Sequence, residues 1–443
     1  MSSQRGAISQ ARIDLRTKAG KLSRPNYAGG VPKAIEQCRV CGNRNLETIL
    51  DLGVQYLTGV FPNPSDAERL GQGPLELVLC AGDSTCGLVQ LRHSFPPSQM
   101  YGDSYGYRSG LNPTMVNHLQ LLAERSKNLV TLQPNDVVID IGSNDGTTLG
   151  FFDSRLSLIG VDPSAKKFAQ HYRDDIIRIP EFFSIDAVKH QMSGRKAKLI
   201  FSIAMMYDLE DPIDFARQVA ACLEPDGVWV FEQSYLPMMI DQLAYDTVCH
   251  EHIEYYGIKQ LEWILREAEM KIIDIQFSPS NGGSVAIGAT HLQNESILES
   301  PDAESAKLKE HSRGFHRREI FEDFAFRVAQ NKSQVLLDID SWKKAGKIVA
   351  GLGASTKGNV LLQYLGVTHN DIAFIGDINP DKHGRVTPGS LIPIISEQAC
   401  LEKDPDVLIV LPWHFANFFE NAQHLVGKDL YFPLPNPRLF SVK

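Results

Sequence analysis

The sequence predicts an α/β protein in which a small cysteine-rich module precedes two open sheets of the doubly wound type. Two short runs of apolar residues each lead into a glycine-containing turn, at residues 137–146 and 347–359. Such strand–turn–helix units build parallel sheets that bind ligands beyond the carboxyl ends of their strands. Four of the seven cysteines lie between residues 38 and 86, and this clustering indicates a metal-binding site.

Length and charge narrow the possible classes of protein. At roughly 100 to 200 residues per domain, the 443 residues suggest two to four domains. The net charge of −9 argues against a general nucleic-acid-binding surface. No apolar run approaches the about 20 residues that span a bilayer, so we expect no membrane contact. The sequence does not indicate an oligomeric state.

Residues 1–33 are expected to form a disordered tail. They are polar, rich in Arg, Lys, Ser and Gly, and lack the apolar core of a secretory signal peptide. The odd number and wide scatter of the cysteines argue against a disulfide framework. We therefore expect a cytoplasmic protein.

Residues 34–110 are predicted to form a zinc-binding module. Cys38 and Cys41 make a Cys-x-x-Cys pair, whereas five residues separate Cys80 from Cys86. Four thiolates in two pairs suit a closed, tetrahedral, structural Zn²⁺ site. Predicted short strands at 47–60 and 75–80 would supply the frame of a zinc ribbon. The alternative is four buried thiols without a metal.

An aromatic loop and a helix follow the module. Tyr101, Tyr105, Tyr107 and Arg108 lie within eight residues, and they could line a sugar or nucleotide pocket. The alternative is a rigid surface loop packed on the next domain. Apolar residues at helical spacing then predict an amphipathic helix over 113–129.

The next turn carries acidic side chains. The buried run 137–141 ends at Gly142, which allows close approach to a ligand. Asn144 stands where a dinucleotide-binding turn has glycine. Asp140 and Asp145 disfavour a pyrophosphate and suit a cationic ligand with an amino-acid part. We expect a helix to begin directly after this turn.

Further strands extend the pattern. A strand over 156–163 carries Asp162, whose carboxylate would accept hydrogen bonds from ribose hydroxyls. Phe183 is expected to lie near the adenine ring, and apolar runs at 197–203 and 228–231 predict further strands. This region, 111–300, resembles the class I S-adenosylmethionine-dependent methyltransferases. An NAD-type Rossmann domain is the alternative.

The densest cluster of groups that titrate near neutral pH is Cys249, His250, Glu251 and His252. A metalloprotease helix needs two further residues between its histidines to place both on one face. On an extended segment, residues two apart share a face instead. We therefore predict acid/base or substrate-binding groups rather than a metal pair. The alternative is a polar, structural helix start.

Residues 301–443 are predicted to form a second doubly wound unit. A long charged helix over 307–339 leads into a strand, a glycine-rich turn and another helix at 347–359, and further strands are expected at 372–378 and 407–411. A diphosphate prefers a cation and N–H donors at a helix start, as Ser355 and Lys357 would provide. The alternative is a degenerate, purely structural repeat.

The succession of these motifs along the chain resembles one family of methyltransferases in particular. These are the three-domain sugar C-methyltransferases that act on nucleotide-linked 4-keto deoxysugars. The resemblance covers nearly all of residues 38–440. Its carriers are the four-cysteine module, the turns 140–146 and 353–359, the His-Glu-His run with Tyr255 and Tyr256, and the segments 281–284 and 377–384. Two positions depart from the family pattern: Cys249 stands where relatives often have tyrosine, and Tyr207 where they often have histidine.

The resemblance implies S-adenosylmethionine as methyl donor, a structural zinc ion, and a nucleotide diphosphate held by the third domain. A base would remove a proton beside the 4-keto group, and the enolate would take the methyl group. From the histidine–carboxylate cluster we assign the base to His252, an orienting role to Glu251, and ketone binding to His250 and Tyr207, although the two histidines could exchange roles.

The implied cofactor residues are Asp140, Gly142, Asn144, Asp145, Asp162 and Phe183. The implied substrate residues are Tyr105, Tyr107, Cys249, Asn281, Ser355, Lys357, Asn359 and Lys382. An O-methyltransferase and an NAD-dependent nucleotide-sugar oxidoreductase are the alternative activities. The nucleotide, the sugar and the methylated carbon stay open.

Overall fold

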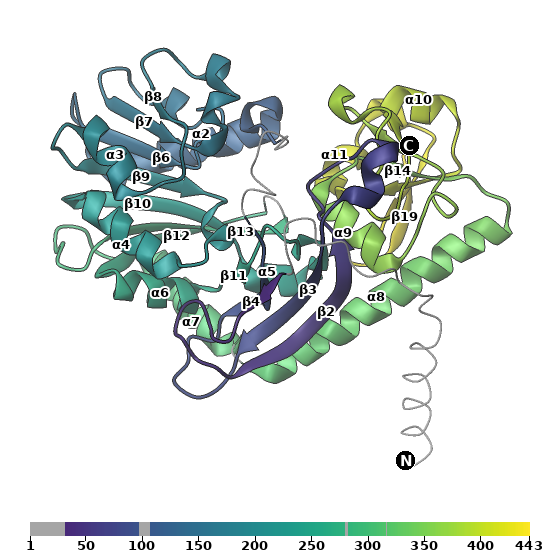
Figure 1. Ribbon diagram of the computed structural model, residues 1–443, viewed down its shortest axis with the longest axis horizontal. Helices are drawn as coiled ribbons and strands as arrows, with labels where there is room; N and C mark the ends of the chain where they lie inside the picture. The colour runs from purple at the N-terminus through teal and green to yellow at the C-terminus, as the bar shows by residue number, and fades with distance from the viewer. Residues whose placement is uncertain (1–31, 97–106, 280–281, 316) are drawn as a thin grey trace.

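The computed structural model describes residues 32–96, 107–279, 282–315 and 317–443. Two α/β lobes lie side by side, and the long strands β2 (Leu46–Tyr56) and β3 (Gln72–Cys80) and helix α8 (Arg318–Lys344) run beneath them (Figure 1). The expected tail lies outside the described residues up to position 31, and Lys33 already belongs to a strand. No helix in the described segments is long and apolar enough to cross a membrane.

The N-terminal module is a four-stranded antiparallel sheet in the order β11-β4-β3-β2. The predicted strands are present as β2 (Leu46–Tyr56) and β3 (Gln72–Cys80), followed by β4 (Val89–Leu91). The edge strand β11 (Glu254–Tyr255) comes from far along the chain and pairs with β4. A short ladder of β1 (Lys33–Ala34) and β5 (His93–Ser94) completes the module.

The first lobe is a seven-stranded sheet in the order β12-β13-β10-β9-β6-β7-β8. Strands β6 to β10 are parallel to one another. Strand β13 is antiparallel to both of its neighbours, β10 and β12. The bounds are β6 Val137–Ile141, β7 Ser157–Val161, β8 Ile177–Ile179, β9 Ala197–Ile203, β10 Leu223–Ser234, β12 Met270–Ser278 and β13 Ser284–His291.

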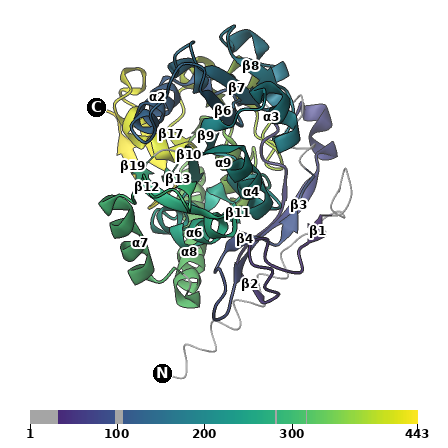
Figure 2. The ribbon, with the colours of Figure 1, turned by 90° about the vertical axis from the view of Figure 1, so that its left-hand side faces the viewer.

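Helices cover both faces of this sheet. Alternate residues of β6 point to opposite cores, because side chains alternate along a strand: Val137 and Ile139 pack with α3 (Ile185–Met192), α4 (Pro212–Cys222) and α6 (Ile258–Glu267), and Val138 packs with α2 (Pro113–Lys127). Figure 2 shows α2 on one side of the sheet and α3 on the other. The predicted helix over 113–129 is therefore confirmed, and Asn112 caps its first turn.

The helix expected after the 142–146 turn is not formed. Only a three-residue 3-10 helix, Leu149–Phe151, follows it. Gly146, Gly150 and two adjacent threonines have low helix propensity, which explains the difference. The predicted helix over 307–339 is also divided: α7 (Pro301–Arg313) ends where Gly314 adopts a left-handed conformation, and α8 (Arg318–Lys344) begins soon after.

The second lobe is a six-stranded sheet in the order β16-β15-β14-β17-β18-β19. All neighbouring strands are parallel except the last pair, so the doubly wound prediction is confirmed. The strands are β14 Val349–Leu352, β15 Ile375–Asp377, β16 Ile394–Ser396, β17 Val407–Val410, β18 Asp429–Phe432 and β19 Arg438–Ser441, with helices α9 Thr356–Leu365, α10 Glu397–Glu402 and α11 Ala416–Glu420.

A connecting segment links the lobes to the module. It comprises α5 (Leu236–Asp241), the 3-10 helix η8 (Tyr245–Thr247) and the loop 248–257. Its apolar side chains share one continuous core with β2, β3, α8 and the second lobe. The connecting segment therefore lies where the three parts meet.

Candidate active site

The four clustered cysteines fit a tetrahedral metal site. Their sulfur atoms all lie within 4.8 Å of one another, and all four are unpaired thiols. At a Zn–S distance of about 2.3 Å, tetrahedral sulfurs lie about 3.8 Å apart. The Cys38–Cys86 and Cys41–Cys80 sulfur pairs are 3.5 and 3.4 Å apart. The longer spacer of the second pair is accommodated because Gly82 and Ser84 adopt positive φ.

The turn after β6, residues 142–146, is called here the acidic turn. Gly142 has φ +77°, and a Cβ there would lie 3.3 Å from Cγ of Met205. Asp162 accepts hydrogen bonds from the backbone N–H groups of Asn144 and Ser164, at 2.9 and 2.6 Å. Burial raises the pKa of Asp140 to about 8, and the nearby charge of Asp162 adds to this shift. The carboxyl groups of Asp140, Asp145 and Asp162 thus lie at this turn, and burial keeps that of Asp140 protonated at pH 7.

The segment before α2 lies over the acidic turn. The backbone N–H of Gly110 donates to Asp145 at 2.9 Å, and the Nδ2 of Asn144 donates to the carbonyl of Tyr107 at 3.2 Å. Tyr107 therefore lies beside the predicted cofactor residues. Phe183 packs edge-on against Phe215 of α4, with ring centroids 5.4 Å apart. Tyr105 and Asn281 lie outside the described residues.

Sequence reasoning missed an ion pair at the same strand ends. Glu232, at the carboxyl end of β10, lies 2.8 Å from the Nε2 of His118 on α2. The hydrogen bond to Glu232 raises the pKa of His118. The position of Glu232 at the end of a buried strand was a usable signal, because ligands of open α/β sheets bind there.

The two histidines of the His-Glu-His run do not share a face, so that expectation is wrong. His250 is fully buried, with Nε2 3.2 Å from the carbonyl of Gly73 and its ring against Phe95. His252 instead packs on Tyr207, with ring centroids 4.3 Å apart. A turn closed by the hydrogen bond from the N–H of His252 to the carbonyl of Cys249 reverses the side-chain directions.

Two further expectations for this run need correction. The residues form a loop, and the next helix begins only at Ile258, so the helix-start alternative is wrong. The Nδ1 of His252 pairs with the carbonyl oxygen of Thr247 at 3.1 Å, so this carbonyl, rather than Glu251, orients the ring. The Glu251 carboxylate lies against Gly59, where a Cβ would stand 2.6 Å from its Oε1.

Burial sets the protonation states of these groups. It lowers the pKa of His252 to about 4, with the positive charge of Lys357 adding to the effect. It also raises the pKa of Glu251 and of the Cys249 thiol. His252 is therefore a neutral imidazole near pH 7.

The turn after β14, residues 353–359, is called here the lysine turn. Ser355 caps α9 by accepting the N–H of Gly358 at 3.0 Å, and Asn359 donates to the carbonyl of Thr58 at 2.8 Å. The Nζ of Lys382 donates to the carbonyl of Ala354 at 2.7 Å. Ser355, Asn359 and Lys382 thus gather at this turn, each with a bond to the protein itself.

The lysine turn and the connecting segment meet at a set of buried polar atoms. Buried polar groups in folded proteins almost always have partners. Here six buried side-chain atoms have none in the described structure, and they come from the end of β2, the connecting segment, α9 and the loop after β17. They are Thr58 Oγ1, Asp246 Oδ1, Thr247 Oγ1, Glu251 Oε2, Asn359 Oδ1 and His414 Nδ1.

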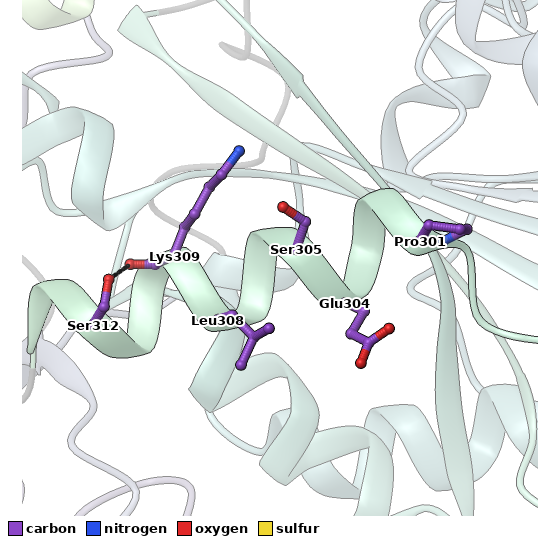
Figure 3. Close-up of a pocket in the computed structure, with 6 residues that line it drawn as sticks. All are labelled: Pro301, Glu304, Ser305, Leu308, Lys309 and Ser312. Atoms are coloured by element: carbon purple, nitrogen blue, oxygen red, sulfur yellow. Dashed lines mark hydrogen bonds between the residues drawn. The ribbon is translucent and has the colours of Figure 1, made fainter.

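A surface groove elsewhere is separate from these residues. It has a volume of about 490 Å³ and lies along the outer side of α7 (Figure 3). One helix alone supplies its lining residues, which are Pro301, Glu304, Ser305, Leu308, Lys309 and Ser312. It contains none of the predicted site residues.

Family models match three successive parts of the chain. They describe a zinc binding domain at residues 38–101, a methyltransferase domain at 115–275 and a C-methyltransferase C-terminal domain at 279–435. The C-methyltransferase NovU of Streptomyces niveus is 27% identical over 420 residues, which cover 93% of this chain and 99% of that protein.

Two further similarities are limited to one part of the chain. A malonyl-(acyl-carrier protein) O-methyltransferase of a Marinomonas species is 25% identical over 167 residues, covering 36% of this chain and 62% of that protein. A solved S-adenosylmethionine-dependent methyltransferase of Clostridium acetobutylicum covers 42% of this chain and 92% of its own, at a TM-score of 0.30 and 12% identity.

The matches fit the geometry. The carboxyl groups of the acidic turn suit the cationic S-adenosylmethionine, and the four thiols suit a structural zinc ion. Both cofactor predictions are confirmed, and methyl transfer to carbon replaces the oxidoreductase alternative. The three family models and the similarity to NovU together show an S-adenosylmethionine-dependent C-methyltransferase with a zinc-binding domain before the methyltransferase domain.

Proposed function

We propose that the enzyme methylates a carbon next to the ketone of a nucleotide-diphosphate-linked 4-keto deoxysugar. The observation that carries this proposal is the meeting of His252, on the connecting segment, with the lysine turn of the second lobe. A carbon acid needs a base at the reacting carbon, and a nucleotide-linked acceptor needs an anion-binding turn nearby. Bound S-adenosylmethionine would supply an electrophilic methyl group.

His252 is suited to act as the base. The carbonyl oxygen of Thr247 can only accept a hydrogen bond, so the Nδ1 of His252 carries the proton. Its Nε2 is then the basic nitrogen. A pKa of about 4 keeps the imidazole in its neutral form at pH 7, so its Nε2 lone pair is not protonated. The ring of Tyr207 packs against the imidazole at an interplanar angle of 58° and helps to hold it in place.

The unpartnered buried atoms support a sugar as the acceptor. Three of them are the carboxylate or amide oxygens of Asp246, Glu251 and Asn359, which accept hydrogen bonds. A ligand with several hydroxyl donors would satisfy them, and an apolar acceptor would not. We keep Ser355, Asn359 and Lys382 as proposed substrate residues, and Asp140, Asn144, Asp145 and Asp162 as proposed cofactor residues.

A solvent-exchange experiment tests the base. A panel of nucleotide-linked 4-keto deoxysugars is incubated with enzyme and S-adenosylhomocysteine in D₂O, and NMR follows loss of the proton beside the ketone. Wild-type enzyme should catalyse exchange and His252→Asn should slow it at least 100-fold. His190→Asn, an exposed histidine on α3, is the control and should behave as wild type.

The outcome separates the alternatives. If His252→Asn binds both ligands and still exchanges at the wild-type rate, this residue is not the base. After transfer of a ¹³C-methyl group, the labelled carbon should resonate at the low chemical shift of a carbon-bound methyl group for C-methylation, and at the higher shift of a methoxy carbon for an O-methyl product.

Partners and location follow from the same proposal. We propose a small-molecule partner and a cytoplasmic location, because all seven cysteines are unpaired thiols, as in reducing compartments. Thermal-shift screening with S-adenosylhomocysteine and with UDP, TDP and GDP would identify the preferred nucleotide.

A further inference from the structure

We infer that Lys357 is a catalytic residue that stabilises the negative charge on the ketone oxygen beside His252, rather than a ligand of the diphosphate. The inference rests on the proposed function. It assigns to the second lobe a part in the chemical step as well as in substrate binding.

The side chain of Lys357 extends away from its own lobe. Lys357 is the second residue of α9, and α9 packs against η8 of the connecting segment. A Cβ on Gly282 would lie 3.8 Å from the Nζ of Lys357 and 3.9 Å from the Cβ of Ala244. The ammonium group therefore reaches the segments that precede His252 and β13, which belong to the first lobe and its connection.

Asp246 provides a fixed carboxylate at this position. It is fully buried, and the Nε1 of Trp413 donates to its Oδ2 at 2.7 Å. The charges of Asp246 and Lys357 influence each other's pKa, and Lys357 lowers the pKa of both His252 and His414. The ammonium group of Lys357 thus lies within electrostatic reach of His252 and of Asp246, whose carboxylate Trp413 orients.

The diphosphate has other donors available at the lysine turn. The first N–H groups of α9 have no partner within the helix. Lys382 also lies at this turn, where its Nζ contacts Ala354 and Asp377 and stands over the ring of Phe61. The turn thus has a second lysine, whose contacts differ from those of Lys357.

His252 and Lys357 account for the proton and the negative charge that move in the chemical step. The Nε2 of His252 takes the proton from the carbon beside the ketone, and the C–H electron pair forms a C=C bond. The carbonyl π pair moves to oxygen, where the ammonium group of Lys357 donates a hydrogen bond to the developing oxyanion. The enolate carbon then takes the methyl group from the sulfonium of the donor, whose C–S pair stays on sulfur.

The test compares turnover with binding. We use the panel member that wild-type enzyme methylates, and measure kcat, KM and the Kd for the matching nucleoside diphosphate. Loss of one oxyanion donor costs about 10²- to 10³-fold in rate, so Lys357→Met should lower kcat and the exchange rate by that factor. The Kd for the nucleoside diphosphate should change less than threefold.

A pH profile gives a second readout. Removing the positive charge of Lys357 should raise the apparent pKa of the base in the profile of kcat, because that charge opposes protonation of His252. The titratable groups around this pair are Tyr207, Asp246, Cys249, Glu251 and His414.

Two further variants separate the loss of the Lys357 charge from a general effect on folding. Lys332→Met removes another half-buried lysine of the same lobe, one that bonds to the carbonyl of Tyr364, and should leave kcat unchanged. If Lys357→Met does not fold because Asp246 is left unpaired, Lys357→Met/Asp246→Asn removes both charges and should show the same loss of kcat.

Three outcomes would overturn the inference. A weakened Kd with unchanged kcat would make Lys357 a diphosphate ligand, and unchanged kcat and Kd would make it structural. If wild-type enzyme methylates no member of the panel, the proposed function fails and this inference fails with it.

Discussion

The acidic turn and the lysine turn occupy the same place in their two sheets, yet they suit opposite ligands. Each follows a strand whose two neighbours are reached by connections on opposite sides, which is the switch point of a doubly wound sheet. The ten-residue helix α9 begins within the lysine turn, whereas only a 3-10 helix follows the acidic turn. The lysine turn thus has a helix N-terminus for an anion, and the acidic turn has carboxyl groups for a cation.

The difference teaches that sheet topology determines where a ligand binds and that the local residues determine its charge. Asp140, Asp145 and Asp162 surround one turn, and Lys357 and Lys382 surround the other. The connecting segment, which carries His252, packs against the second lobe.

Disrupting the zinc site should have the largest effect, because the module supports the segment between the turns. Structural zinc contributes roughly 10 kcal/mol or more to folding in small zinc domains, and β11, directly after His252, pairs with β4 of the module. Chelation or Cys41→Ser should lower methyl transfer at least 100-fold. Calorimetry should find that S-adenosylhomocysteine still binds.

Metal analysis should give one zinc ion per chain in wild-type enzyme. Cys222→Ala, which removes a buried thiol outside the cluster, should keep both zinc and activity. Full activity without zinc would show that the two turns come together without the module.

Asp162→Asn tests whether the acidic turn affects the binding of S-adenosylhomocysteine without affecting the binding of the nucleoside diphosphate. The substitution removes the charge that accepts the N–H of Asn144, and charge-assisted hydrogen bonds are worth about 1.5–3 kcal/mol. The Kd for S-adenosylhomocysteine should rise about 10- to 100-fold, while the Kd for the nucleoside diphosphate stays constant. Asp153→Asn, at an exposed position after the same turn, is the matched control; equal loss of both ligands would contradict independent turns.

Asp140 should make the acidic turn sensitive to pH. Its pKa is raised to about 8 in the folded protein, so the folded state holds a proton that the unfolded state has lost above about pH 4. This contribution is present at low pH and is lost as pH rises through 8. In Asp140→Asn it is absent, so the stability of this variant relative to wild type should rise by about 1.4 kcal/mol per pH unit between pH 5 and 8.

Urea unfolding at several pH values measures this difference. Asp153→Asn should not show the same trend, because Arg155 lowers the pKa of Asp153. A pH-independent difference between Asp140→Asn and wild type would mean that Asp140 is already ionised.

Glu310→Gln should have the smallest effect, since it lies away from both turns. Glu310 of α7 accepts the N–H groups of Ile258 and Lys259 at 2.8 and 3.0 Å, and so caps α6 from outside. Losing a helix cap costs about 1 kcal/mol, and ligand affinities should not change. Glu304→Gln, exposed on the same helix, is the control; a changed ligand Kd would show that the turns depend on distant packing.

The sequence allowed accurate prediction where local signals determine structure. The β-branched runs gave β6 and β9 with their observed bounds, and the two cysteine pairs gave the metal cluster. These features depend on burial of short runs and on thiol chemistry, which are both visible locally.

Long-range contacts could not be predicted in this way. The hydrogen bond of Trp413 to Asp246 joins residues 167 positions apart, and the bond of Asn359 to Thr58 joins residues 301 positions apart. The opposite directions of His250 and His252 depend on the Gly73 and Thr247 carbonyls, which only tertiary packing brings to them.

The pairing of β11 with β4 affects how the N-terminal module folds during translation. The module sheet is assembled from residues 46–91 and from residues 254–255, so its edge at β4 stays open until much of the first lobe has been synthesised. During translation, the backbone groups along that edge of β4 have no strand partner. Completion of the N-terminal sheet therefore waits for the connecting segment to emerge. A truncated chain that ends before Glu254 would expose the unpaired edge of β4, which favours aggregation.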